Sequence, residues 1–526
     1  MKKHNKLLLG LILLLAIFLR FFSLGNNPPS LYWEEAALGY DAYSILKTGK
    51  DFHGHSWPLV AFESFGDYKP SMYFYATVPF ITLFDLTPLA IRFPSALFGS
   101  LTVLLLFYLT KQFFKKPTVP LLSSLFLAIS PWHIQLSRTA FEANLGLFFI
   151  TLGVWLFIKG TQKTKWLIIS VIPLSLSMYT YHANRVLVPI LGLALGLFYL
   201  KKLVKNKTQT AIALLIFTML TFPLAIRLNT PKVKQRFLET SAFSDLKPIN
   251  QSSQLILEDG GGLVPRLVHH RFFSYSKVFI NHYLDHFKLD YLFFSGDQNP
   301  RHSTQSVGGL YMIQFPLLLF GLFWLVSSKK SLFLPIILWL ILAPVPSALT
   351  KTTPHALRSL SLVIPLSIIS AYGLSKLLKQ KWLTFFCLLV LLFEFSRYQY
   401  IYHLDYPKLH QSQWQYGYQE LIESIEIVKT DYQNIYLTRE LGRPSIYYWF
   451  YTKTNPTLVQ ATESTVKKDQ GEFLEFDNLK FGLPQNNQYS LNSLIIAGPT
   501  DQVPFNNPQK IIYNLNHEPV FYLYQN

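Results

Sequence analysis

Two adjacent glutamates are candidates for acid–base chemistry, within the stretch LYWEEAALGYDAYSILKTGKDFHG. We predict a short helix here. Adjacent positions on a helix point about 100° apart, so Glu34 and Glu35 cannot both face one substrate atom. One of them could act as a general base on a hydroxyl or amine while its neighbour anchors the loop. A solvated acidic face on a helix at the membrane interface is the alternative interpretation.

A lysine further along, Lys69, is a candidate phosphate ligand. It lies in Gly66-Asp67-Tyr68-Lys69-Pro70, which we predict to be a turn, and Asp67 joins it as a candidate substrate contact. As a compact positive charge, Lys69 could meet an anionic headgroup, or it could simply snorkel to the membrane interface.

Two histidine–arginine pairs, each with a spacing of three residues, are further candidates. At the start of a helix such a pair shares one face and could clamp a phosphate diester, to which the helix N-terminus adds its own donors. The pairs are His182/Arg185 and His355/Arg358. Anchoring at the membrane interface is the alternative for each pair. Arg138 and Glu142, four residues apart, could pair with one another.

One histidine pattern, His282-Tyr283-Leu284-Asp285-His286, is similar to the zinc helix of a metallopeptidase. That motif needs glutamate where Asp285 stands, because the longer side chain reaches the metal-bound water. The sequence also offers no assigned third ligand. We therefore assign no metal ligands and no certain cofactor; the chemistry permits a divalent metal without requiring one.

Apolar segments dominate the first 400 residues. Half of the chain is hydrophobic and 14% is charged, whereas soluble domains carry roughly 25% charged residues. A bilayer core about 30 Å thick takes about 20 apolar residues per helix. We predict eleven spans, at roughly 7–24, 88–110, 118–134, 143–158, 166–180, 186–200, 210–227, 310–326, 331–349, 359–375 and 382–397.

The net charge of +18 would suggest a nucleic-acid partner, but its distribution argues otherwise. Eighteen lysines in six acid-free clusters flank the predicted spans, and the remaining 29 basic residues balance 29 acidic ones. The clusters are Lys2/Lys3/Lys6, Lys111/Lys115/Lys116, Lys159/Lys163/Lys165, Lys201/Lys202/Lys205/Lys207, Lys329/Lys330 and Lys376/Lys379/Lys381. Basic loops stay cytoplasmic, so the charge indicates a cytoplasmic N-terminus and excludes nucleic acid as the partner.

After about residue 398 the long apolar runs end, and the pattern of this tail predicts a soluble α/β domain. It has helical periodicity over 417–429 and short β-rich runs at 434–438, 493–497, 510–515 and 519–524. We therefore predict an α-helical polytopic membrane domain at 1–397, with outer loops at 25–87 and 228–309, and an extracytoplasmic domain at 398–526. The single cysteine, Cys387, excludes an intrachain disulfide.

Over about residues 1–400 the chain resembles the C-type (GT-C) membrane glycosyltransferases. The similarity is to the bacterial branch of dolichyl-phosphate-mannose protein mannosyltransferase-like and aminoarabinose transferase-like proteins. It rests on the stretches WEEAALGYDAYSILKTGKD, FGDYKPSMYFY, RFPSALFGSL and SPWHIQLSRTAFEANL. The resemblance implies a GT-C fold for the membrane domain.

The resemblance also implies roles for particular residues. The family carries an Asp-Glu pair whose aspartate is the proposed catalytic base; here Glu34 stands at the aspartate position and Glu35 at the glutamate position. Lys69 would contact the lipid-linked phosphate, and Glu142 would match a second acid near the acceptor. Position and charge add Arg138, His182, Arg185, His355 and Arg358.

The function implied by the resemblance is transfer of a hexosyl or pentosyl group at the outer surface of the plasma membrane. The donor would be a polyprenyl-phosphate sugar, the acceptor an extracytoplasmic lipid, glycan or protein of the cell envelope, and the anomeric carbon would be inverted. One alternative is a transporter or flippase of lipid-linked sugar, which needs ionisable residues at mid-depth in the membrane. A non-catalytic membrane scaffold is the other.

Overall fold

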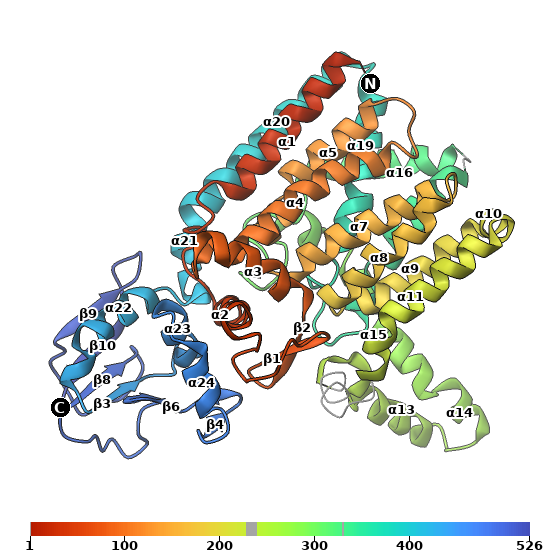
Figure 1. The fold of residues 1–526 in the computed structure, drawn as a ribbon. Helices are drawn as coiled ribbons and strands as arrows, with labels where there is room; N and C mark the ends of the chain where they lie inside the picture. Colours follow the sequence, from red (N-terminus) through yellow and green to blue (C-terminus); the bar gives the residue numbers. More distant parts are fainter. Residues whose placement is uncertain (1, 228–238, 329–330) are drawn as a thin grey trace. The chain divides into compact units, whose positions relative to one another are not determined.

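The computed structural model describes residues 2–227, 239–328 and 331–526 and divides the chain into two compact units (Figure 1). The first unit comprises Met1–Arg20, Phe98–Ser137 and Glu142–Tyr398; the second comprises Phe21–Leu97, Arg138–Phe141 and Gln399–Asn526. The second unit therefore joins the segment after the first helix to the tail. The domain boundary at residue 397 stays a prediction. Residues 228–238 of the predicted outer loop and the Lys329/Lys330 cluster lie outside the described residues.

The predicted spans all fall on apolar helices. Within the described ranges, six helices are long and apolar enough to cross a membrane, or seven if one bent pair is counted as a span. They are α1 (Lys3–Phe21), α4 (Pro88–Thr110), α7 (Glu142–Gly160), α11 (Lys207–Arg227), Leu360–Leu377, which contains α19 (Val363–Leu377), and Lys381–Leu409, which begins with α20 (Lys381–Tyr400). The chain is thus a multi-pass membrane protein, while the count of eleven spans stays a prediction.

The bent pair has a local cause. Helix α5 (Thr118–Ile129) and helix α6 (Pro131–Ser137) meet at 58°. A proline disfavours the helical conformation of the residue before it, and Ser130 accordingly has φ −57° and ψ 123°. The break places the short helix α6 next to the loops described below. Shorter apolar helices are α3 (Met72–Phe84), α8 (Lys165–Thr180), α9 (Asn184–Phe198), α16 (Gln314–Ser327), α17 (Leu334–Leu342) and α18 (Val345–Ala348).

Close helix packing organises the first unit. Helix α8 packs against α7, α9 and α11, and α19 packs against α5 and α16 (Figure 1). At the α16–α19 contact a Cβ on Gly321 would lie 2.1 Å from the carbonyl oxygen of Ile369, and a Cβ on Gly373 would lie 2.1 Å from that of Leu317. Small residues that let two backbones approach in this way are typical of helix contacts in membranes.

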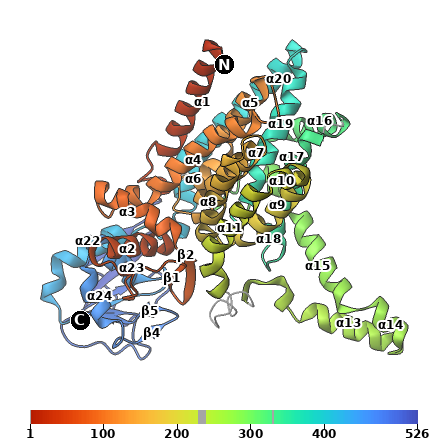
Figure 2. The same ribbon diagram turned by 45° about the vertical axis from the view of Figure 1, so that its right-hand side comes forward.

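A helical arm precedes the loops of the first unit. It consists of α13 (Lys247–Glu258), α14 (Leu263–Val268) and α15 (Arg271–Asp285), and the three helices are seen together in Figure 2. The arm is followed by a π-helical turn at Asp290–Phe294 and by the loop 295–313.

The second unit contains the α/β region predicted for the tail. Its six-stranded sheet has the order β6-β7-β3-β8-β10-β9, in which β3 runs parallel to β7 and β8 and the other pairs are antiparallel. The strands are β3 (Asn434–Leu437), β6 (Glu475–Phe476), β7 (Leu479–Phe481), β8 (Ser493–Ala497), β9 (Lys510–Tyr513) and β10 (Pro519–Gln525). The helix predicted at 417–429 is present as α22 (Tyr418–Val428).

Helix α2 (Trp33–Thr48) is held inside the second unit by residues of the tail. It packs against α3, α23 (Pro444–Tyr451) and α24 (Pro456–Thr462). Tyr447 donates a hydrogen bond of 3.0 Å to the carbonyl of Leu31, just before α2, and Tyr40 on α2 donates one of 2.9 Å to the carbonyl of Thr454. The tail therefore supports the helix that carries the acidic pair.

Candidate functional site

The acidic pair opens α2, as the sequence predicts. Tyr32 is extended, with ψ 161°, and the helix begins at Trp33, so Glu34 and Glu35 lie in its first turn. Carboxylates are favoured there because the unpaired N–H groups and the helix dipole give this end a partial positive charge. The two side chains have different surroundings, since 31% of the Glu34 side chain is exposed and Glu35 is fully buried.

Glu34 forms an ion pair with Lys69. Lys69 lies on β2 (Asp67–Pro70), which pairs with β1 (Ala61–Ser64) in a hairpin that places Lys69 opposite Phe62. The prediction of a turn at Lys69 was therefore wrong by a few residues: the turn is at Phe65–Gly66, and the lysine is on the following strand. Asp67 Oδ2 lies 3.9 Å from Lys69 Nζ. The hairpin thus fixes one cation between two partly exposed carboxylates.

Glu35 is saturated by partners inside the protein. Its Oε2 lies 2.9 Å from Arg92 Nη2, and its Oε1 accepts hydrogen bonds of 3.0 Å from Arg92 Nε and 2.9 Å from the backbone N–H of Ala140. Such a two-pronged pairing of arginine with carboxylate fixes orientation as well as charge. Glu35 therefore joins three separate segments of the second unit, and the catalytic role predicted for it stays a prediction.

Arg92 is a site residue that the sequence reasoning did not name. It is fully buried near the start of α4 and also donates 2.8 Å and 3.3 Å hydrogen bonds to the carbonyls of Pro28 and Leu24. The sequence did contain a sign of this role, because the stretch RFPSALFGSL places an arginine near the start of a predicted apolar span. A charged side chain in such a place normally has a partner in the protein.

Arg138 is also buried and is engaged by the backbone. It donates hydrogen bonds of 2.9 Å to the carbonyl of Asn27 and 3.2 Å to the hydroxyl of Tyr402, and its guanidinium stacks over the Tyr402 ring. Arg138 belongs to the second unit, whereas Glu142 begins α7 in the first. The substrate-binding role predicted for Arg138 and the acid role predicted for Glu142 stay predictions.

The two histidine–arginine pairs lie in the first unit. His182 precedes α9, and Arg185 lies in its first turn, where its Nε donates a 3.1 Å hydrogen bond to the carbonyl of Met178. His355 and Arg358 lie instead in the turns that precede the short helix at Leu360–Leu362, so this pair is not at the helix start that the prediction assumed. Arg358 Nη1 donates a 2.8 Å hydrogen bond to Thr350 Oγ1.

His355 lies close to two residues that the sequence reasoning did not single out, Asp297 and His302. Burial raises the pKa of Asp297, but the hydrogen bond and charge of His302 outweigh that effect and leave the pKa below its ordinary value. Burial, together with the positive charge of Arg358, holds the pKa of His355 well below its ordinary value. No local sequence pattern links positions 297, 302 and 355, because residues so far apart in the sequence come together only in the folded chain.

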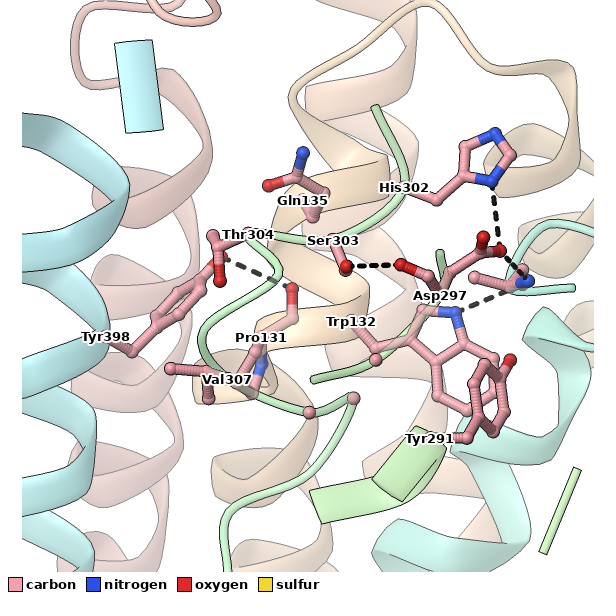
Figure 3. Close-up of a pocket in the computed structure, with 14 residues that line it drawn as sticks. Pro131, Trp132, Gln135, Tyr291, Asp297, His302, Ser303, Thr304, Val307 and Tyr398 are labelled. Carbon is pink, nitrogen blue, oxygen red and sulfur yellow. Dashed lines mark hydrogen bonds and ion pairs between the residues drawn. The ribbon is translucent and has the colours of Figure 1, made fainter. Parts of the chain in front are cut away.

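A small pocket adjoins this cluster in the first unit (Figure 3). Trp132 on α6 lies in its wall and donates a 3.1 Å hydrogen bond to the carbonyl of Ala356. Tyr291 lies next to Trp132, with the two rings 5.5 Å apart, and Asp297 and His302 face each other at one end in Figure 3. Polar and aromatic groups from α6, from the segment 291–309 and from the end of α20 thus meet in this recess.

Some histidines outside these pairs and the 297–355 cluster have protein partners. In the metallopeptidase-like pattern, His286 bonds through Nε2 to Ser347 Oγ at 2.7 Å and through Nδ1 to the carbonyl of His282 at 2.9 Å. His53 Nδ1 lies 3.0 Å from Glu463 Oε1 in the second unit. The absence of metal ligands in the 282–286 pattern stays a prediction.

One family model and one curated protein match part of this sequence. Residues 68–226 match the family model described as dolichyl-phosphate-mannose-protein mannosyltransferase. The Bacillus subtilis (strain 168) protein named "Putative mannosyltransferase YkcB" is 25% identical over 245 residues, which are 46% of this chain and 33% of that protein. The chain therefore matches about a third of the length of that relative.

Solved structures establish the fold. ArnT from Cupriavidus metallidurans in the apo state has a TM-score of 0.55 at 11% identity, covering 93% of this chain and 92% of ArnT. The same protein bound to undecaprenyl phosphate has a TM-score of 0.53 at 11% identity, covering 93% of each chain. An Archaeoglobus fulgidus oligosaccharyltransferase tethered to an acceptor peptide has a TM-score of 0.50 at 12% identity, covering 86% of this chain and 63% of the other. The predicted GT-C-like fold, with its C-terminal α/β region, is confirmed.

Proposed function

We propose, from the C-type membrane glycosyltransferase fold of this chain, that it transfers a sugar from a polyprenyl-phosphate donor to an extracytoplasmic acceptor, with inversion. The acceptor would be a lipid, glycan or protein at the outer surface of the plasma membrane, where the tail would also lie. The observation that carries the proposal is the difference between the two glutamates of α2. Glu35 is buried and bonded to Arg92 and to the N–H of Ala140, whereas Glu34 is partly exposed and paired with a lysine.

The ion pair of Glu34 with Lys69 suggests how the reaction begins. A donor phosphate would compete with Glu34 for the charge of Lys69, because a phosphodiester oxygen and a carboxylate oxygen are similar hydrogen-bond acceptors. Binding of the donor would then turn Lys69 towards the phosphate and release Glu34 for proton transfer. The base would thus become available when the donor is in place.

The chemical step follows from these roles. The acceptor hydroxyl or amine attacks the anomeric carbon, the bond from that carbon to the phosphate oxygen breaks, and the electron pair leaves with the lipid phosphate. Glu34 takes the acceptor's proton. Lys69 balances the charge that develops on the leaving phosphate, which removes the need for a general acid. The leaving group occupies one face of the sugar, so attack from the other face inverts the centre.

The test is release of lipid phosphate, together with transfer of labelled sugar, by membranes that contain the full chain. Loss of a general base typically costs about 100-fold to 10,000-fold, so Glu34→Gln should lower turnover by that range. Lys69→Ala should weaken use of the donor. Matched controls are Glu423→Gln on α22 and Lys47→Ala on α2, which change exposed residues of the same types. Their turnover should stay at the wild-type level.

Three outcomes would contradict the proposal or part of it. Full turnover in Glu34→Gln would remove Glu34 as the base. Movement of labelled lipid-linked sugar across the membrane without a transferred product would favour the transporter alternative. Absence of both transfer and movement with every polyprenyl-phosphate sugar tested would favour a scaffold.

A further inference from the structure

Three side chains of metal-binding type meet in the first unit, outside the Glu34–Lys69 site. Asp297 and His302 come from the loop 295–313, and His355 comes from the turns before Leu360–Leu362. The ligand atoms that they offer all lie within 4.8 Å of one another. Asp297 and His302 are buried, and the exposure of His355 is intermediate.

The carboxylate at the centre of this cluster is held by the backbone. Asp297 Oδ1 accepts a 2.8 Å hydrogen bond from the N–H of Asn299, and Oδ2 accepts one of 2.6 Å from the N–H of Ala356. The second contact ties the 297 loop to the residue that follows His355. Bonds of this kind orient a ligating carboxylate before an ion arrives.

The two imidazoles flank that carboxylate. His302 Nδ1 lies 3.0 Å from Asp297 Oδ2, and the rings of His302 and His355 are 5.0 Å apart (Figure 3 shows Asp297 and His302). His355 Nδ1 is buried and makes no hydrogen bond in the described structure. Buried polar atoms are nearly always satisfied, so an unsatisfied imidazole nitrogen beside a carboxylate and a second imidazole indicates a missing partner.

We propose that Asp297, His302 and His355 bind a divalent transition-metal ion, with Zn²⁺ as the best fit. Two imidazoles and one carboxylate suit Zn²⁺ and its neighbours Mn²⁺, Fe²⁺, Co²⁺ and Ni²⁺, whereas Ca²⁺ and Mg²⁺ prefer all-oxygen sites. Bonds of about 2.1 Å would bring tetrahedral ligand atoms to roughly 3.4 Å from one another. From separations of at most 4.8 Å, rotation of the side chains can supply that closure.

Three protein ligands leave at least one coordination position for a water molecule or a substrate oxygen, as in zinc sites that act on substrates. The pocket of Figure 3 contains Asp297 and His302 in its wall and has room for a water-sized ligand beside them. The ion would also join two loops that are far apart in the sequence. Arg358 lowers the affinity, because its positive charge acts on His355.

The experiment uses the full chain, purified in detergent and stripped with a chelator, and titrates it with Zn²⁺. We expect one tight equivalent per chain, measured by calorimetry and by metal analysis after gel filtration. His302→Ala, His355→Ala and Asp297→Asn should each weaken binding at least tenfold, whereas Arg358→Gln should strengthen it. The control is His282→Ala, from the metallopeptidase-like pattern on α15, which should bind Zn²⁺ as the wild type does.

A second measurement distinguishes the loss of a metal ligand from misfolding of the variant. Co²⁺ in place of Zn²⁺ gives visible absorption bands that report the ligand set, and His355→Gln should change those bands while the chain elutes from gel filtration as the wild type does. The proposal is overturned if the stripped wild type binds no Zn²⁺, or if His282→Ala loses the ion while His302→Ala and His355→Ala keep it. These readouts do not depend on sugar transfer, so they stand or fall separately from the proposed function.

Discussion

Glu35 and Arg92 form a completely buried ion pair, with 2.9 Å between Oε2 and Nη2 and 3.0 Å between Oε1 and Nε. The pair joins the start of α2 to the start of α4, and the third contact of Glu35, with the N–H of Ala140, adds the segment 138–141. The position of Glu34 next to Glu35 is therefore set by a rigid anchor. We infer that the exposed glutamate is held in place through its buried neighbour.

Breaking this pair should destabilise the second unit strongly. Removal of one member of a buried ion pair typically costs about 3–5 kcal/mol, because the other charge is left without compensation. Arg92→Met should therefore lower the free energy of unfolding by that amount, measured by denaturant unfolding of the full chain in detergent. The double variant Glu35→Gln/Arg92→Met should recover part of the loss. Equal stabilities of the single and double variants would contradict a coupled pair.

The helical part of the fold was predictable because hydropathy is read along the sequence. The predicted span 88–110 coincides with α4, and the predicted β-run 493–497 coincides with β8. What could not be predicted depends on contacts between distant segments. Arg92 becomes a site residue only through Glu35, and Lys69 was assigned to a turn because the pairing of β1 with β2 is not visible in its local pattern.

In the tail, too, the sequence predicted the longer elements but not the contacts between distant segments. Its helix and four strands were recognisable, but the short strands β6 and β7 were not, because two or three residues carry too little alternation. The packing of α2 against α23 was also invisible, since it joins segments about 400 residues apart. A single sequence therefore located the acidic pair but could not show that the tail supports it.

The length of the carboxylate side chain at position 34 should affect turnover. Glu34 reaches Lys69 from the first turn of α2, and Glu34→Asp shortens that side chain by one methylene. We expect turnover to fall about tenfold and to stay above that of Glu34→Gln, because the carboxylate is kept but displaced by roughly 1 Å, and small displacements of catalytic groups are costly. The measurement is lipid-phosphate release at saturating donor. Turnover of Glu34→Asp at or above the wild-type level would show that this geometry does not limit the reaction.

The stability of the second unit should depend on pH through Glu472. Burial raises the pKa of this carboxyl from 4.5 to about 7, although its Oε1 accepts a 2.9 Å hydrogen bond from the N–H of Ser445. Because the folded state holds the proton more tightly than the unfolded state, the contribution of Glu472 is complete below about pH 4.5 and is lost as pH rises through about 7. The loss is on the order of 3 kcal/mol.

Glu472→Gln cannot ionise and should remove this dependence. Denaturant unfolding, followed by tryptophan fluorescence, to which the buried Trp414 and Trp449 of the second unit contribute, should show a more stable variant than the wild type at pH 8 and equal stabilities near pH 4. Glu475→Gln is the matched control, because Glu475 is largely exposed and paired with Lys480. Parallel pH profiles for the wild type and Glu472→Gln would show that Glu472 does not cause the loss.

The glycine contact between α16 and α19 should tolerate no added methyl group. A Cβ on Gly321 would lie 2.1 Å from the carbonyl oxygen of Ile369, which is backbone and cannot move without separating the helices. We expect Gly321→Ala to lower the unfolding temperature in detergent, with a cost of about 1–3 kcal/mol or more. Gly192→Ala on α9 is the control, because no atom outside the neighbouring helix backbone lies within 4 Å of its added Cβ in the described part of the chain. That variant should be neutral or slightly stabilised, since alanine favours a helix over glycine by roughly 1 kcal/mol. Equal melting of the two variants would show that the close approach of α16 and α19 is not required.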